Sequence, residues 1–230
     1  MHRYFLGLPG LDDATGGIAD GTNVMLIGPP MCGKRALLDG IMASGIQSHE
    51  AVILVDARGP GRDALERLKP PEGAPVGVVD CISRTLGAAV SDTARVKHMS
   101  SPVDLTGVSV RVDSLAEELG PAGDGHIRLC IDSLSTILMY SNLQAVFRFM
   151  HVVAGQVALR RNLGVYVVDE HMHDPQTIAT LKQLFNAVLQ VKVEDDRSFV
   201  RATGLTPRPT PWFEYEVVDH AVLMGGPRRD

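Results

Sequence analysis

The chain has 230 residues, of which 45% are hydrophobic and 21% are charged, and its formal net charge is −5. A chain of this length and composition can bury a sizeable core, so one domain spanning residues 1–230 is expected. The 27 acidic residues outnumber the 22 basic ones and no long basic run occurs, which disfavours sequence-independent nucleic-acid binding.

The cysteine pattern and the apolar segments predict the compartment. Cys32, Cys81 and Cys130 are an odd, widely spaced set that suits neither a disulfide framework nor a Cys-x-x-Cys metal site. The first residues lack a charged leader followed by a long apolar stretch, and no segment approaches ~18 consecutive apolar residues. We therefore expect a cytoplasmic protein without a membrane segment.

Strands and helices are expected to alternate up to residue 185, which is typical of βαβ units around a buried parallel sheet. In chain order we expect strand 23–27, helix 34–45, strand 51–57, helix 63–68, strand 76–82, helix 112–119, strand 126–132, helix 142–161, strand 164–170 and helix 174–185. Asp174 can cap the last helix, with Pro175 in its first turn. The predicted fold class is α/β, with a mainly parallel central sheet and helices on both faces.

The last part of the chain changes pattern. Strand sequences at 187–205 and 212–224 follow one another without a helix, which predicts a C-terminal antiparallel extension of the sheet. The polar segment 83–106 has no clear period and predicts a loop-rich insertion at the functional edge of the sheet. The hairpin 191–203 and the segment 212–217 are expected to leave strand edges and aromatic surface for another subunit or a partner to cover.

The stretch "GPPMCGKR" joins the first central strand to the first long helix and predicts a phosphate-binding loop. Such a G-x-x-x-x-G-K-[ST] loop surrounds phosphates with backbone N–H groups, a helix N-terminus and the lysine ammonium. The alternative is a Gly/Pro turn with an exposed lysine. The predicted nucleotide-binding residues are Gly28, Pro29, Pro30, Met31, Cys32, Gly33, Lys34 and Arg35.

The final position of this loop departs from the motif. Arg35 stands where a hydroxyl residue ligates Mg²⁺, and a guanidinium has five donors and no acceptor. Arg35 therefore cannot ligate the ion and adds positive charge at its place. We expect weakened Mg²⁺ binding and slow or absent hydrolysis, because the metal neutralises developing charge in phosphoryl transfer.

Two carboxylates at predicted strand ends are candidates for the chemistry. Asp132 ends "HIRLCID" and is the candidate indirect Mg²⁺ ligand, with capping of the next helix as the alternative. Asp56 ends "AVILVD" and is the candidate catalytic residue that acts on water, although its side chain is short and an ordinary loop residue is the alternative. Glu66 and Glu170 are weaker candidates.

Other polar groups have two interpretations each. The stretch "DEHMHD" places His171 and His173 among Asp169, Glu170 and Asp174, which indicates either a metal cluster or a chance gathering of polar residues, and His173 could sense a γ-phosphate. Lys192, Arg197 and Arg201 could reach a neighbouring subunit's phosphate or form a solvated hairpin face. Cys32 is either a thiol activated by Lys34 or a small residue that fits.

The residues before the loop resemble the opening of KaiC-like members of the RecA/KaiC superfamily. "CIDSLSTILMYS" resembles the metal-binding strand of that superfamily, and "DPQTIATLKQLFNAVLQVKV" is similar to a later helix and strand of archaeal KaiC-like proteins. A departure is Asp56-Ala57, where KaiC often has paired glutamates. The residues that match the opening in order are Gly10, Leu11, Asp12, Asp13, Gly16, Gly17 and Ile18.

The resemblance is to single-domain archaeal P-loop NTPases of KaiC type, here with a degenerate Walker A motif. It implies a RecA-like core, ATP as the nucleotide, and a homo-oligomer or a partner ATPase. Our first hypothesis is an ATP-binding regulatory protein with weak or absent hydrolysis. The alternatives are an active Mg²⁺-dependent ATPase, in which a water replaces the missing hydroxyl, and a recombinase accessory factor that binds DNA through a local basic patch.

Overall fold

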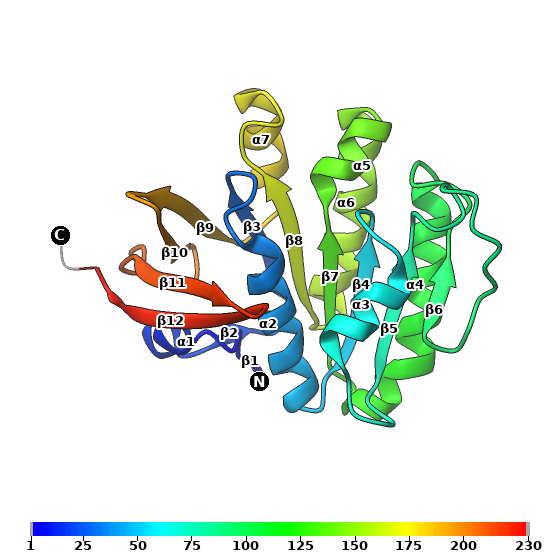
Figure 1. The fold of residues 1–230 in the computed structure, drawn as a ribbon, viewed down its shortest axis with the longest axis horizontal. Coiled ribbons are helices and arrows are strands. Elements are labelled where there is room, and N and C mark those ends of the chain that lie inside the picture. Colours follow the sequence, from blue (N-terminus) through cyan, green and yellow to red (C-terminus); the bar gives the residue numbers. More distant parts are fainter. Residues whose placement is uncertain (1, 229–230) are drawn as a thin grey trace.

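The computed structural model describes residues 2–228 and contains one ten-stranded sheet (Figure 1), with the strand order β12-β11-β10-β9-β3-β8-β7-β4-β5-β6. Strands β3 to β9 pair in parallel, whereas β9 to β12 pair antiparallel. Strand bounds are β3 (Asn23–Gly28), β4 (Ala51–Asp56), β5 (Val76–Asp80), β6 (Val96–His98), β7 (Ile127–Asp132), β8 (Leu163–Asp169), β9 (Ala187–Glu194), β10 (Arg197–Thr203), β11 (Phe213–Val218) and β12 (Ala221–Pro227). A separate pair joins β1 (Arg3–Tyr4) to β2 (Ile18–Ala19).

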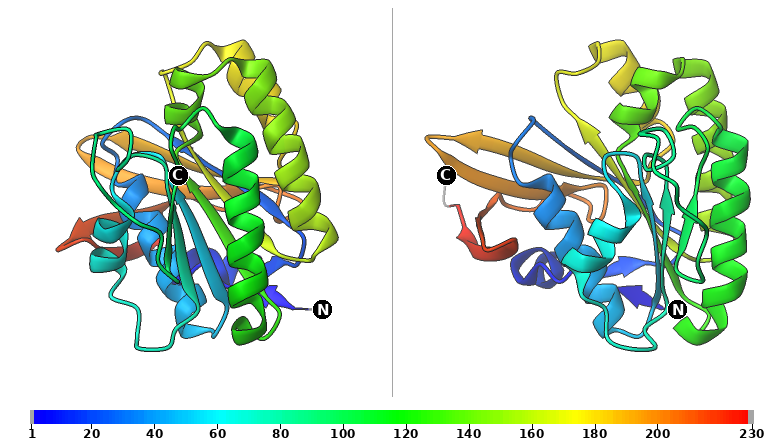
Figure 2. Two further views of the ribbon diagram at one scale, coloured as in Figure 1. Left: turned by 90° about the vertical axis from the view of Figure 1, so that its right-hand side faces the viewer. Right: turned by 45° about the vertical axis from the view of Figure 1, so that its right-hand side comes forward.

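Helices cover both faces of the sheet, as the edge-on view shows (Figure 2). One buried cluster contains residues of α2 (Lys34–Gln47) and α3 (Gly61–Leu68), and the other contains residues of α4 (Leu105–Leu119), α5 (Leu134–Tyr140), α6 (Leu143–Leu159) and α7 (Pro175–Lys182). Every residue of β3, β4, β7 and β8 is buried, because a parallel sheet between two helical layers has no solvated face. Helix α1 (Pro9–Thr15) and a short 3-10 turn (Gly120–Gly123) complete the elements. The predicted α/β class with its antiparallel extension is confirmed.

Two predicted elements need correction. Helix α4 begins at Leu105 rather than at 112, because Asp104 caps it by accepting the Gly107 N–H at 2.8 Å. Helix α5 was not predicted as a separate helix, and Ser133 rather than Asp132 caps it. The segment 83–106 is rich in loops as predicted, and it also contains the short edge strand β6, which pairs with β5.

The predicted strand edge at 212–217 is wrong. Strand β11 pairs with β10 on one side and with β12 on the other, and its Phe213 and Tyr215 side chains are buried. The chain returns as β12 and covers the edge locally. The edge strands of the described sheet are therefore β12 and β6.

A buried arginine, ion-paired with a glutamate, joins β7 to α2, the helix that follows the predicted phosphate loop. Arg128 is fully buried, and its Nε and Nη2 atoms lie 2.7 and 3.0 Å from the two carboxylate oxygens of Glu50. Its Nη1 donates to the Ile41 carbonyl of α2 at 2.5 Å. A side chain at Gly45 would meet Arg128 Nε at 2.8 Å, so glycine makes room for the pair. This contact holds α2 against the strand that ends at Asp132.

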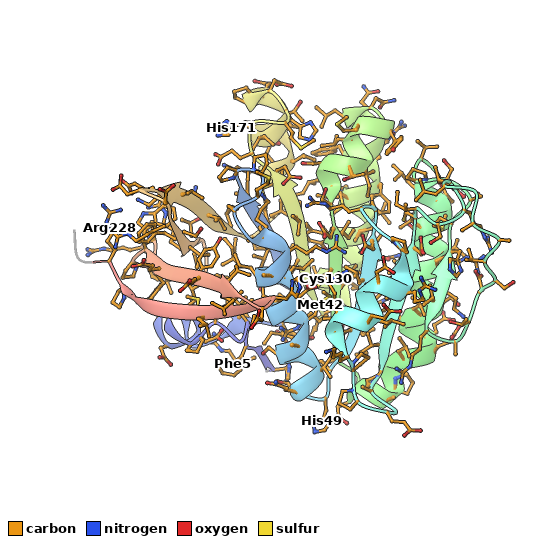
Figure 3. The ribbon with its side chains drawn as sticks, viewed as in Figure 1. Phe5, Met42, His49, Cys130, His171 and Arg228 are labelled. Atoms are coloured by element: carbon orange, nitrogen blue, oxygen red, sulfur yellow. The ribbon has the colours of Figure 1, made fainter. Side chains whose placement is uncertain are left out.

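All three cysteine thiols are free and buried, and Cys130 lies in the middle of the sheet (Figure 3). Within residues 2–228, none of the helices combines the length and the apolar character needed to span a bilayer.

Candidate functional site

Four neighbouring central strands bring the predicted site residues together at their carboxyl ends. Gly28 at the end of β3 stands opposite Asp169 at the end of β8, and Asp56 at the end of β4 stands opposite Asp132 at the end of β7. These ends point to the top of Figure 1. Ligands of open α/β sheets bind outside the carboxyl ends of the strands, so these strand ends form the candidate site.

The Gly28–Lys34 loop leads from β3 directly into α2, and its backbone requires glycine. Gly33 has φ +83°, and a Cβ there would lie 2.9 Å from Val217 Cγ2, while a Cβ on Gly28 would lie 2.7 Å from Val191. Met31 also has a positive φ, and its side chain is fully exposed. Among residues 2–228, no side chain caps α2 at Gly33, which leaves the positive end of the helix dipole to an anion.

Lys34 is buried rather than exposed, in contrast to the alternative of a simple turn. Its Nζ donates to the carbonyls of Gly28 at 2.8 Å and Pro29 at 2.5 Å. It also lies 3.0 Å from Asp169 Oδ1 and 3.7 Å from the buried Cys32 sulfur. The ammonium therefore lies inside its own loop, facing the strand ends.

Arg35 joins the two carboxylates that the sequence singled out. Its Nη2 lies 2.5 Å from Asp56 Oδ2 and its Nη1 lies 3.2 Å from Asp132 Oδ2. Both carboxylates are buried, with side-chain exposures of 0% and 1%. Burial lowers the pKa of Arg35, but the charges of Asp56 and Asp132 outweigh it and leave that pKa raised. The guanidinium is therefore a fixed positive charge between the candidate metal-binding and water-activating groups.

Arg58 and Asp169 complete the site, and the sequence analysis gave neither of them these roles. Arg58 Nη1 lies 3.5 Å from Asp132 Oδ1 and 4.0 Å from Asp169 Oδ2. The only sequence signal was that Arg58 directly follows the predicted strand 51–57 and that Asp169 lies near the end of the predicted strand 164–170. We call the resulting set the carboxylate–cation cluster; it comprises Lys34, Arg35, Arg58, Asp56, Asp132 and Asp169.

Asp132 has a raised pKa. Within the described chain neither of its oxygens has a hydrogen-bond partner, because Arg35 and Arg58 approach without hydrogen-bond geometry. Burial raises the pKa of Asp132 from 3.8 to about 6, the two guanidinium groups oppose the rise, and Asp56 and Asp169 add to it. Ionised Asp132 is therefore less stable here than in water.

This pKa predicts a pH-dependent contribution to stability. A raised carboxylate pKa means that the folded protein holds the proton more tightly than the unfolded chain. The free energy of unfolding should therefore fall, relative to Asp132→Asn, by up to about 3 kcal/mol as the pH rises from about 4 to about 7. Urea unfolding of both proteins across this range measures the difference. A stability difference between the wild type and Asp132→Asn that does not change with pH would contradict the assignment.

A groove of about 530 Å³ lies beside the loop. Residues 31–33 line one side of it, and residues 196–198 and 214–217 of the C-terminal strands line the other. The Tyr215 hydroxyl donates to the Cys32 carbonyl and attaches β11 to the loop. The volume is in the range of small-molecule sites.

The structure does not gather the histidine stretch into a metal site. Among residues 2–228, no group of three or more His, Cys, Asp and Glu side chains could hold a metal ion. Asp174 instead caps α7 by accepting the Thr177 N–H at 2.9 Å, as predicted. His171 lies near the start of α7, at the upper side of the molecule (Figure 3).

The remaining candidates lie outside the cluster. Glu66 is exposed on α3, 3.5 Å from Arg62, and Glu170 donates its N–H to the Gly28 carbonyl. The hairpin cations lie over aromatic rings, with Lys192 Nζ 4.7 Å and Arg201 4.4 Å from the Trp212 ring centre. Arg197 lies 3.6 Å from Glu214.

One family model, described as a family of unknown function (DUF7504), matches residues 21–191, which is more than half of the chain. The chain belongs to the DUF7504 family. The matched DUF7504 segment includes the Gly28–Lys34 loop and every residue of the carboxylate–cation cluster. No match was found among curated proteins.

Comparison with a solved structure identifies the fold of this DUF7504 chain. It is similar to a crystal structure of a KaiC-like protein from the hyperthermophilic archaeon Pyrococcus horikoshii OT3, with a TM-score of 0.71 and 13% sequence identity over 98% of this chain and 99% of that one. This similarity confirms the KaiC-like, RecA-type fold that the sequence predicted.

The residues present fit a nucleotide but not Mg²⁺. The glycine backbone, the uncapped start of α2 and Lys34 are the parts that hold phosphates in such loops. A dication at Asp132 would meet the Arg35 guanidinium, which lies 3.2 Å from that carboxylate, repels a cation and supplies no lone pair. The site is thus suited to phosphate binding without a divalent ion.

Proposed function

We propose that the protein is a KaiC-like ATP-binding regulatory protein that hydrolyses ATP slowly or not at all. One observation carries the proposal: Arg35 bridges Asp56 and Asp132. In a hydrolytic site these positions would serve Mg²⁺ and the attacking water. Here the Arg35 guanidinium is ion-paired with both carboxylates. The site can therefore still hold phosphate, but Asp56 and Asp132 are not available for Mg²⁺ and water.

The groove beside the loop supports nucleotide binding. Its size and its position next to Met31–Gly33 suit the base and sugar of a nucleotide whose phosphates lie on the loop. We propose that bound nucleotide alters the contact between Tyr215 and the Cys32 carbonyl, and so changes the C-terminal strands. The readout would be assembly with further copies of the chain or with a partner ATPase, in the cytoplasm.

The test is nucleotide binding by the wild type and by Lys34→Ala. The wild type should bind ATP or ADP, and the variant should bind at least about tenfold more weakly because charge-assisted contacts to phosphate are lost. Calorimetric titration in EDTA and in MgCl₂ measures both, and sedimentation of the same samples reports nucleotide-dependent assembly. Lys182→Ala, in the last turn of α7, is the matched control and should bind like the wild type.

Two results would overturn the proposal. Equal responses of the wild type and Lys34→Ala to saturating nucleotide would remove the loop from nucleotide binding. Steady turnover at ~1 s⁻¹ or faster, an ordinary enzymatic rate, would instead establish the active Mg²⁺-dependent ATPase.

A further inference from the structure

Arg58 differs from the other two cations of the carboxylate–cation cluster. Its side chain is 39% exposed, compared with 3% for Lys34 and 29% for Arg35. Its ion-pair distances of 3.5 and 4.0 Å are the longest in the cluster. Arg58 is therefore the cation that can leave its carboxylates at the smallest cost, because exposed, loosely paired charges contribute little to stability.

The backbone of Arg58 is held in place although its side chain is not. Asp56 Oδ1 accepts the N–H groups of Arg58 and Gly59, each at 2.9 Å. These bonds hold the start of the loop between β4 and α3 at the strand end. A movement of the Arg58 guanidinium thus needs side-chain rotation only.

Arg58 also lies next to the lysine of the loop. Lys34 Nζ contacts Oδ1 of Asp169, and Arg58 Nη1 contacts Oδ2 of the same carboxylate. In loops of this kind the backbone holds the α- and β-phosphates, and the lysine reaches the β- and γ-phosphates. A third phosphate would therefore lie on the side of Lys34 where Asp169 and Arg58 are.

We propose that Arg58 distinguishes nucleoside triphosphates from diphosphates by exchanging Asp132 and Asp169 for the terminal phosphate. The inference rests on the proposed function and adds the residue that sets its specificity. A guanidinium binds phosphate oxygens in a bidentate manner, which its present contacts with two separate carboxylates do not provide. Arg35 is unsuited to this role because its departure would leave buried Asp56 without a cation.

The experiment compares the ratio of ADP and ATP dissociation constants in the wild type, Arg58→Gln and Arg58→Lys. Calorimetric titration in EDTA should show that the wild type prefers ATP. Arg58→Gln should weaken ATP binding about tenfold and change ADP binding less than about threefold. Arg58→Lys keeps the charge without the bidentate geometry and should lose part of the preference.

Arg62→Gln is the matched control, because Arg62 follows in the same segment, is 82% exposed and contacts only residues of its own helix at ion-pair distance among the described residues. It should keep the wild-type ratio. Thermal unfolding shows which variants are folded. If Arg58→Gln does not fold, the test uses the nucleotide ratio of Arg58→Lys alone. A wild type that binds both nucleotides with an unchanged ratio in the Arg58 variants would overturn this inference alone. A wild type that binds neither nucleotide would overturn the proposed function, and this inference with it.

Discussion

Arg35→Thr is expected to make ATP binding depend on Mg²⁺. The substitution removes the guanidinium between Asp56 and Asp132 and supplies the hydroxyl that ligates the ion in loops of this type. We expect MgCl₂ to strengthen ATP binding by the variant by at least about tenfold and to leave the wild type nearly unchanged. Calorimetric titration of both proteins, in EDTA and in MgCl₂, measures this difference.

The same variant should respond to Mg²⁺ in the absence of nucleotide. Two buried carboxylates without Arg35 repel each other, and a bound dication would relieve that repulsion. The thermal midpoint of Arg35→Thr should therefore rise with MgCl₂, whereas those of the wild type and of Arg62→Gln should not. If the wild type hydrolyses ATP rapidly and Arg35→Thr abolishes turnover, Arg35 is a catalytic residue and the proposed function is wrong.

Glu50→Ala is expected to lower the free energy of unfolding by about 3–5 kcal/mol, because it leaves a fully buried arginine without its counterion. The loss should also loosen α2 from β7, since Arg128 contacts the Ile41 carbonyl as well. Urea unfolding at neutral pH measures the change. Glu118→Ala breaks a pair with Lys97 at the surface and should have no measurable effect.

A double substitution separates the stability lost through the unpaired charge of Arg128 from the stability lost through poorer packing. Replacing Glu50 by leucine together with Arg128 by methionine removes both charges and keeps apolar volume, so most of the lost stability should return. If Glu50→Ala costs no more than Glu118→Ala, the pair does not hold α2 to β7 in the way described.

Local pattern was enough to predict the elements around the site. The apolar runs at 23–27, 51–57 and 126–132 indicated buried strands, because a strand covered on both faces needs apolar residues throughout. The spacing of Gly28, Gly33 and Lys34 predicted the loop between β3 and α2. The turn requires glycine at positions 28 and 33. The cap of Asp174 on α7 was also local. These features depend on neighbours within a few residues.

The pairing of charges in the site was decided by the tertiary structure. The residue type at position 35 of the loop showed that Arg35 cannot ligate Mg²⁺, but the strand order β3-β8-β7-β4 determines that its guanidinium meets Asp56 and Asp132. The same order brings Arg58 to Asp169, which ends a strand two places from β4 in the sheet. Neighbouring strands are selected by the packing of both helical layers on the whole sheet, which no local period in the sequence records.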